Sequence, residues 1–168
     1  VLVEVARRLA AAVRDTDMVV RWGGEEFMIY APATDPGSVA GMAARILETV
    51  GTAPVDAGSC RIPVTLTAGV VALPPVAGDA FDWQCAVRLA DWALYQGKAQ
   101  GRNQARIVTR LCAAAATVMA ALERDGDGDG AAVGALLALD CVHGPRQDPA
   151  RQPQAAARDA GAGAGASP

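Results

Sequence analysis

The heptapeptide at residues 21–27, Arg-Trp-Gly-Gly-Glu-Glu-Phe, constrains this chain more than any other stretch. Short apolar runs flank it at residues 18–20 and 28–30. Glycine accepts the positive φ that tight hairpin turns require, so apolar runs on both sides of a Gly-Gly pair indicate two strands joined by a turn. The sequence therefore predicts a β-hairpin over about residues 18–31.

Two carboxylates follow directly after this turn. Glu25 and Glu26 stand beside Gly23 and Gly24, where no side chain shields the backbone. Hard oxygens bind Mg²⁺ and Mg²⁺ binds phosphate, so a bare backbone beside paired acids suits a phosphate held through a divalent cation. The alternative is an exposed hairpin tip whose two glutamates are merely solvated.

Helical and extended patterns alternate on either side of the hairpin. Apolar residues at helical spacing predict an amphipathic helix over residues 1–14. A second helix is predicted over 35–50, capped by Asp-Pro, and a third over 82–99. The β-branched run 62–73 reads as a strand, expected to be central, and 107–108 adds a short last strand. This order predicts an α/β sheet with helices on its faces.

The composition shifts after residue 111 to Ala, Gly, Asp, Pro, Arg and Gln. Residues 112–123 are compatible with an Ala-rich helix, but 125–168 lacks the apolar bulk that offsets ordering entropy and is predicted to be disordered. The Asp-Gly repeat at 125–130 imitates the start of an EF-hand. Position twelve of that frame is Leu136, where calcium needs a bidentate acid, so we interpret the repeat as a flexible acidic linker.

Charge and cysteine content exclude several classes. A net charge of -3 leaves no basic footprint for nucleic acid. Four separated cysteines and a single histidine give no zinc constellation and no Ser-His or Cys-His dyad, so free thiols are expected. The N-terminus shows no signal-peptide pattern, and the longest apolar run, 111–122, is too short to cross a bilayer. These features predict a soluble, cytoplasmic chain without a membrane segment.

The heptapeptide resembles the signature of the GGDEF family, the diguanylate cyclases, in its Glu-for-Asp form. Further matches to that family are residues 64–70, 90–95, Lys98 and 101–103, so the resemblance covers roughly residues 1–108. It implies a central sheet similar to that of nucleotide cyclase catalytic domains, with the signature on an antiparallel hairpin. It also implies the condensation of two GTP molecules into cyclic di-GMP and two pyrophosphates.

The resemblance assigns roles around the hairpin. It implies that Glu25 is the catalytic carboxylate and a metal ligand, and that Glu26 assists in holding Mg²⁺ or Mn²⁺. This agrees with the chemistry, because a ribose hydroxyl that attacks an α-phosphate must lose its proton beside crowded negative charge. Gly23 and Gly24 would let the backbone approach the nucleotide.

Two further groups of residues fall at family-like positions. Lys98 and Arg102 match the pair that contacts the triphosphate, although a basic turn at a helix end also complements the helix dipole. Arg14-x-x-Asp17 and Arg45 match a site where the product binds and inhibits. Guanidinium groups suit that role through bidentate contacts to phosphates and guanine edges.

The resemblance also implies that part of the domain is missing. In the family a strand with a metal-binding Asp, and a segment that recognises guanine, precede the first helix seen here. We therefore expect residues 1–110 to form a partial GGDEF domain and 111–168 a largely disordered tail, with little activity in the chain by itself. Catalysis would need a homodimer, since each subunit holds one GTP. The alternative is a non-catalytic cyclic di-GMP-binding or regulatory module, or an inactive fragment.

Overall fold

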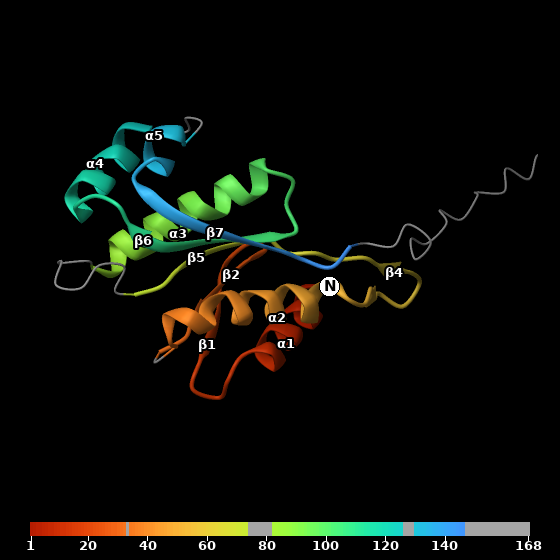
Figure 1. Ribbon diagram of the computed structural model, residues 1–168. Coiled ribbons are helices and arrows are strands. Elements are labelled where there is room, and N and C mark those ends of the chain that lie inside the picture. Colours follow the sequence, from red (N-terminus) through yellow and green to blue (C-terminus); the bar gives the residue numbers. More distant parts are fainter. Residues whose placement is uncertain (33, 74–81, 126–129, 147–168) are drawn as a thin grey trace, which may run out of the picture.

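The computed structural model describes residues 1–32, 34–73, 82–125 and 130–146. Within them the chain is a mixed α/β protein with three small sheets: the hairpin β1–β2, the short pair β3–β4, and the three-stranded sheet β5–β6–β7 (Figure 1). The elements in chain order are α1 Leu2–Ala12, β1 Met18–Gly23, β2 Glu26–Tyr30, η1 Pro36–Ser38, α2 Val39–Gly51, β3 Val55–Asp56, β4 Arg61–Ile62, β5 Ala68–Val71, α3 Trp83–Ala99, β6 Gln104–Leu111, α4 Ala115–Asp125, α5 Ala131–Gly134 and β7 Leu137–His143.

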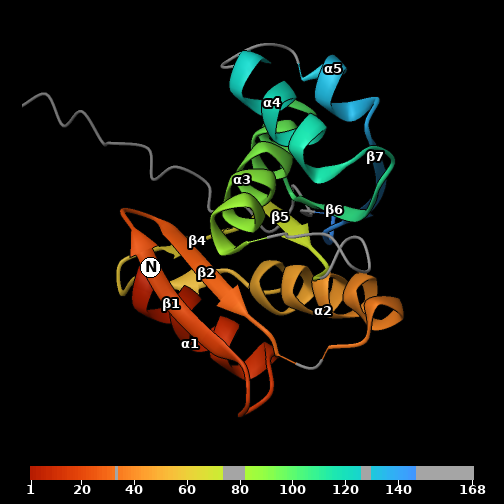
Figure 2. The same ribbon diagram turned by 90° about the vertical axis from the view of Figure 1, so that its left-hand side faces the viewer.

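The three-stranded sheet lies between α2 on one face and α3 on the other (Figure 2). The central strand β6 pairs in parallel with β5 and antiparallel with β7. Ala105 and Ile107 of β6 pack against α2, whereas Val108 packs against α3. The close approach of α3 to β5 requires Gly69, because a Cβ there would collide with the carbonyl oxygen of Ala90.

The hairpin is held by helices on one side. Val5, Leu9 and Ala12 of α1 form a buried cluster with Ile46 and Val50 of α2. Three apolar side chains of the hairpin pack against this cluster; they are Val19, Phe27 and Ile29. Because strand residues alternate between faces, this packing fixes which face of the hairpin points outward.

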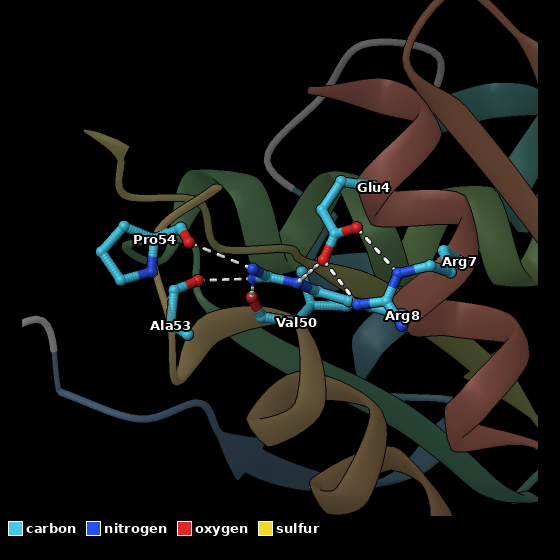
Figure 3. A network of polar contacts seen from close by, with 6 residues as sticks. All are labelled: Glu4, Arg7, Arg8, Val50, Ala53 and Pro54. Atoms are coloured by element: carbon cyan, nitrogen blue, oxygen red, sulfur yellow. Dashed lines mark hydrogen bonds and ion pairs between the residues drawn. The ribbon is translucent and has the colours of Figure 1, made fainter. Parts of the chain in front are cut away.

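A buried arginine joins α1 to the end of α2 (Figure 3). The Arg8 guanidinium donates hydrogen bonds to the carbonyl oxygens of Val50, Ala53 and Pro54, and its Nε donates to Glu4 Oε1 at 2.9 Å. The last carbonyls of a helix have no intrahelical partner, so Arg8 supplies donors to acceptors that α2 and the turn after it leave without one.

Several expectations from the sequence are confirmed. The three predicted helices correspond to α1, α2 and α3, and the predicted hairpin corresponds to β1 and β2. The second helix begins later than expected, because residues 36–38 form η1, and Asp35 makes no side-chain cap hydrogen bond. The helix expected at 112–123 corresponds to α4. Asp82 begins α3 as its N-cap, accepting a hydrogen bond from the Cys85 N–H at 2.8 Å.

The strand predicted over 62–73 is wrong in length and in position. Pro63 interrupts it, because proline has no N–H to donate to a ladder. β4 ends at Ile62 and pairs with β3, whereas β5 starts only at Ala68. The central position belongs to β6, which is also longer than the predicted strand at 107–108.

The expectation of disorder is wrong for part of the predicted tail. Residues 131–134 form α5 and 137–143 form β7, which pairs along the whole of β6. Val133 and Leu137 are buried in a cluster with α3 and α4, so this segment contributes apolar surface that its average composition conceals. The Asp-Gly repeat lies largely outside the described residues, as does 147–168.

In the parts of the chain that the structure describes, none of the helices is both long and apolar enough to cross a bilayer.

Candidate functional site at the hairpin tip

The hairpin turn consists of Gly24 and Glu25, between Gly23 and Glu26, which pair with each other. Gly24 has a φ of +51°, a conformation that costs glycine little and other residues more. The Arg21 side chain braces the turn by donating to the Gly24 carbonyl oxygen, from Nε at 3.0 Å and from Nη2 at 2.6 Å. The turn is therefore held in one shape by its own strand.

The two carboxylates of the tip are both exposed. Glu26 Oε1 lies 3.3 Å from Nζ of Lys98, which belongs to the last turn of α3. The two side chains are 49% and 44% exposed, so this ion pair contributes little to folding stability. Its importance is positional, because it places a cation from α3 beside an acid that lies 72 residues away in the chain.

The backbone at the tip is open. A Cβ added to Gly23 or to Gly24 would meet no atom within 4 Å. Crowding inside the chain therefore does not explain the glycine at position 23. An approaching ligand would explain it, since only a residue without a side chain lets another molecule contact its backbone closely.

Arg102 lies in the turn that follows α3. It adopts a φ of 59°, unusual for a residue with a Cβ, and its N–H donates to the Gly97 carbonyl oxygen at 3.0 Å. Among the described residues, no hydrogen bond or ion pair joins Arg102 to the hairpin. The structure thus brings Lys98 to the tip and leaves the Arg102 side chain exposed in the adjoining turn.

A second group of predicted residues meets at a hollow of about 320 Å³. Arg14 and Arg45 both line it, and Arg45 is fixed there because its Nε donates to the Ala12 carbonyl oxygen at 2.8 Å. Asp17 does not line the hollow. Its carboxylate accepts a hydrogen bond from the Arg14 N–H at 2.9 Å, which shapes the turn between α1 and β1.

Residues 1–104 match the family described as "Diguanylate cyclase, GGDEF domain". The chain belongs to the GGDEF family.

Relatives of this GGDEF domain include a response regulator and two diguanylate cyclases. The response regulator PleD of Caulobacter vibrioides is 39% identical over 105 residues, which cover 61% of this chain and 22% of PleD. Diguanylate cyclase DgcZ of Escherichia coli is 34% identical over 109 residues, 64% of this chain and 35% of DgcZ. Diguanylate cyclase A of Treponema denticola is 34% identical over 107 residues, 62% of this chain and 27% of that protein. The matched region thus spans about a fifth to a third of these relatives.

The donor set of the GGDEF hairpin is compatible with a magnesium ion. Among the residues described here, no group of three His, Cys, Asp or Glu side chains is arranged to hold a metal. Magnesium, however, usually takes only one or two protein carboxylates and completes its shell with water and substrate phosphates. Glu25 and Glu26 offer such oxygens at an exposed position.

Sequence reasoning missed the part that Arg21 plays in this GGDEF domain. It also missed Thr34 and Ser38, which line the hollow beside Arg14 and Arg45. The role of Arg21 could have been predicted from the sequence, because a long cationic side chain three residues before Gly24 can reach the carbonyl oxygen of the turn. No sequence pattern indicates the positions of Thr34 and Ser38, since they depend on the path of the chain between β2 and α2.

Proposed function

We propose that this domain serves as a diguanylate cyclase, which condenses two GTP molecules into cyclic di-GMP and releases two pyrophosphates. The observation that supports this most directly is the hairpin tip. Two exposed carboxylates, Glu25 and Glu26, stand beside an open backbone with the Lys98 ammonium group 3.3 Å from Glu26. Acids, a cationic side chain and an open backbone suit a polyphosphate substrate.

The carboxylate of Glu25 is assigned the role of general base for the ribose 3′-hydroxyl of GTP. Located in the turn, it can accept the proton of a ribose 3′-hydroxyl as the oxygen attacks an α-phosphate. Mg²⁺ or Mn²⁺, held by Glu25 and Glu26 when bound, would neutralise the phosphates. Gly23 and Gly24 let the nucleotide approach the backbone, and Arg21 keeps that backbone in place.

The turn after α3 is assigned to the triphosphate. Lys98 already lies beside the tip. Arg102, four residues further along the chain, adds a second positive charge in the turn after α3. When a phosphate binds, the Lys98 ammonium group can leave its ion pair with Glu26 and bind the phosphate oxygens instead. This releases Glu26 for the cation, so a single rearrangement prepares both groups.

Cyclisation forms two phosphodiester bonds, and each subunit offers one hairpin tip. The reaction therefore requires two copies of the domain whose tips face one another, and we assign it to a homodimer. Since its substrate is GTP, we place the reaction in the cytoplasm.

The test of catalysis is the production of cyclic di-GMP from GTP with Mg²⁺ by the full-length wild-type protein and by its Glu25→Gln variant. The substitution keeps the shape and removes the base, so activity should fall by a factor on the order of 10² or more. Glu48→Gln is the control, because Glu48 is also exposed but lies on α2. Equal activity of Glu25→Gln and Glu48→Gln would refute the role of Glu25.

A second candidate function is cyclic di-GMP binding without catalysis. The hollow supports it, because two arginines, Arg14 and Arg45, converge there and Asp17 shapes the adjoining turn. The same site in a catalytic protein would provide product inhibition. Bidentate guanidinium contacts to phosphate and guanine suit such a ligand.

Calorimetric titration with cyclic di-GMP distinguishes these cases. Arg14→Ala should weaken binding by roughly tenfold or more, since it removes one charged hydrogen-bonding contact. Arg7→Ala serves as the control, because Arg7 is exposed on α1, where it pairs with Glu4 and does not line the hollow. Binding without turnover would favour the regulatory module, and equal affinities of the two variants would exclude Arg14 from the site.

A further inference from the structure

Strand β7 brings together a cysteine and a histidine two residues apart, so the expectation that the chain has no Cys-His pair is wrong. The Cys141 sulfur lies 3.7 Å from Nε2 of His143, and both residues are exposed. Residues at i and i+2 of a strand project from the same face, so the contact follows from the extended backbone. His143 is the single histidine of the chain, and Cys141 is therefore the one cysteine of the four that can contact an imidazole.

The thiol of Cys141 also connects to the interior. It donates a hydrogen bond to Oε1 of Gln104 at 3.0 Å, and Gln104 is only 2% exposed. The Gln104 amide nitrogen in turn donates to the carbonyl oxygens of Gly97 and Gln100, both at 3.0 Å. These carbonyls belong to the end of α3, where backbone acceptors lack helical partners.

The other three cysteines differ from Cys141 in their surroundings. Cys60 and Cys112 are exposed and have no imidazole beside them. Cys85 is half-buried at the start of α3, and burial, followed by the neighbouring Asp82 carboxylate, raises the pKa of its thiol. Cys60 and Cys112 therefore serve as controls for an exposed thiol, and Cys85 serves as the control for a half-buried one.

We propose that Cys141 is a modification site that takes low-molecular-weight disulfides, with His143 as its base and Gln104 as its link to the end of α3. The imidazole accepts the thiol proton and the Cys141 sulfur attacks one sulfur of the disulfide. A new S–S bond forms to Cys141, the original S–S bond breaks, and the departing thiolate takes up a proton. The disulfide is the oxidant, so no further reactant is needed.

The adduct changes the hydrogen bonds around Gln104. Once Cys141 carries a disulfide, its sulfur has no proton to donate to Gln104 Oε1. The Gln104 amide then loses the partner that orients it toward α3, and the last turn of α3 opens more often. That turn contains Lys98 and leads to Arg102, so the adduct also weakens GTP binding, a consequence that rests on the proposed function.

The first experiment measures which thiol reacts. The 168-residue protein is treated with glutathione disulfide, and the rate at each cysteine is followed by peptide mass mapping. Cys141 is expected to react faster than Cys60 and Cys112 by a factor on the order of ten, because it alone has an adjacent base. His143→Gln is expected to bring the Cys141 rate down to theirs. Equal rates in the wild-type protein, or no effect of His143→Gln, would overturn the proposal.

The second experiment measures the link to α3 without any nucleotide. Amide hydrogen exchange is compared before and after glutathionylation at Gln100 and Arg102, whose N–H groups bond to Gln96 and Gly97. Exchange at both should accelerate several-fold in the wild-type protein and stay unchanged in treated Cys141→Ser. Unaltered exchange in the modified wild type would overturn the link. Accelerated exchange without any change in GTP affinity would preserve the site and contradict the phosphate role of Lys98 and Arg102.

Discussion

The Arg8 network provides the sharpest test of how this fold is held together. Arg8 and Arg7 are neighbours on α1 and both pair with Glu4, but their side chains are 10% and 68% exposed. Of these two arginines, Arg8 is the one that donates, among the described residues, to backbone carbonyls beyond its own helix. The pair of substitutions Arg8→Leu and Arg7→Leu therefore compares a buried guanidinium with an exposed one in the same helix.

The structure sets the expected size of the effect. Arg8→Leu removes the donors to the carbonyl oxygens of Val50, Ala53 and Pro54, and the adjoining ion pair with Glu4. Breaking a buried charged network from one side typically costs about 3–5 kcal/mol, because the remaining polar groups stay desolvated. Arg7→Leu removes one exposed pair, worth about 1 kcal/mol at most.

Urea unfolding of the two variants, followed by circular dichroism, measures the difference in the free energy of unfolding. We expect Arg8→Leu to lose at least about 3 kcal/mol relative to Arg7→Leu, with the same slope of free energy against urea concentration. If both variants lost the same small amount of unfolding free energy, the hydrogen bonds from Arg8 to the end of α2 would not stabilise the fold, and the reasoning would be refuted.

Three further predictions follow from the described contacts. Hydrogen bonds from Arg7 and then Arg8 lower the pKa of Glu4 from 4.5 to about 2, so Glu4 adds stability that is present above pH 4.5 and lost as the pH falls toward 2. Glu4→Gln should flatten that part of the stability profile in acid unfolding, and an unchanged profile would contradict the pairing. Gly69→Ala should destabilise the protein by about 1–3 kcal/mol in thermal unfolding, since the added Cβ would collide with the backbone of α3. Gly41→Ala, in open space on α2, should instead stabilise by up to about 1 kcal/mol. Lys98→Gln should weaken GTP binding in calorimetry while changing the free energy of unfolding by less than about 1 kcal/mol; a larger stability loss would mean that its ion pair is structural.

The local features of this chain could be read from its sequence. The Gly-Gly pair between apolar runs predicted the hairpin, although the turn lies one residue later than expected, at Gly24 and Glu25. The periodic apolar residues predicted α1, α2 and α3. The family was identified from the heptapeptide and its companion motifs. Each of these signals acts between residues that are close in the chain, where backbone preference and side-chain period decide the outcome.

Pairing between distant segments was decided only by the tertiary structure. Nothing in the local pattern of 104–111 showed that β6 would be central, because that depends on β7 occupying its second edge. The average composition of the tail concealed Val133 and Leu137, whose burial depends on a surface supplied by α3 and α4.

The same division holds at the candidate site. The sequence placed both acids on the hairpin, since neighbours along a turn stay together wherever the turn goes. It could not place Lys98 at 3.3 Å from Glu26, or show which acceptors the Arg8 guanidinium would meet. Helical periodicity puts Arg8 nearer to the apolar stripe of α1 than Arg7, but only the packing of α1 against α2 brings the carbonyl oxygens of Val50 and Pro54 to the Arg8 guanidinium.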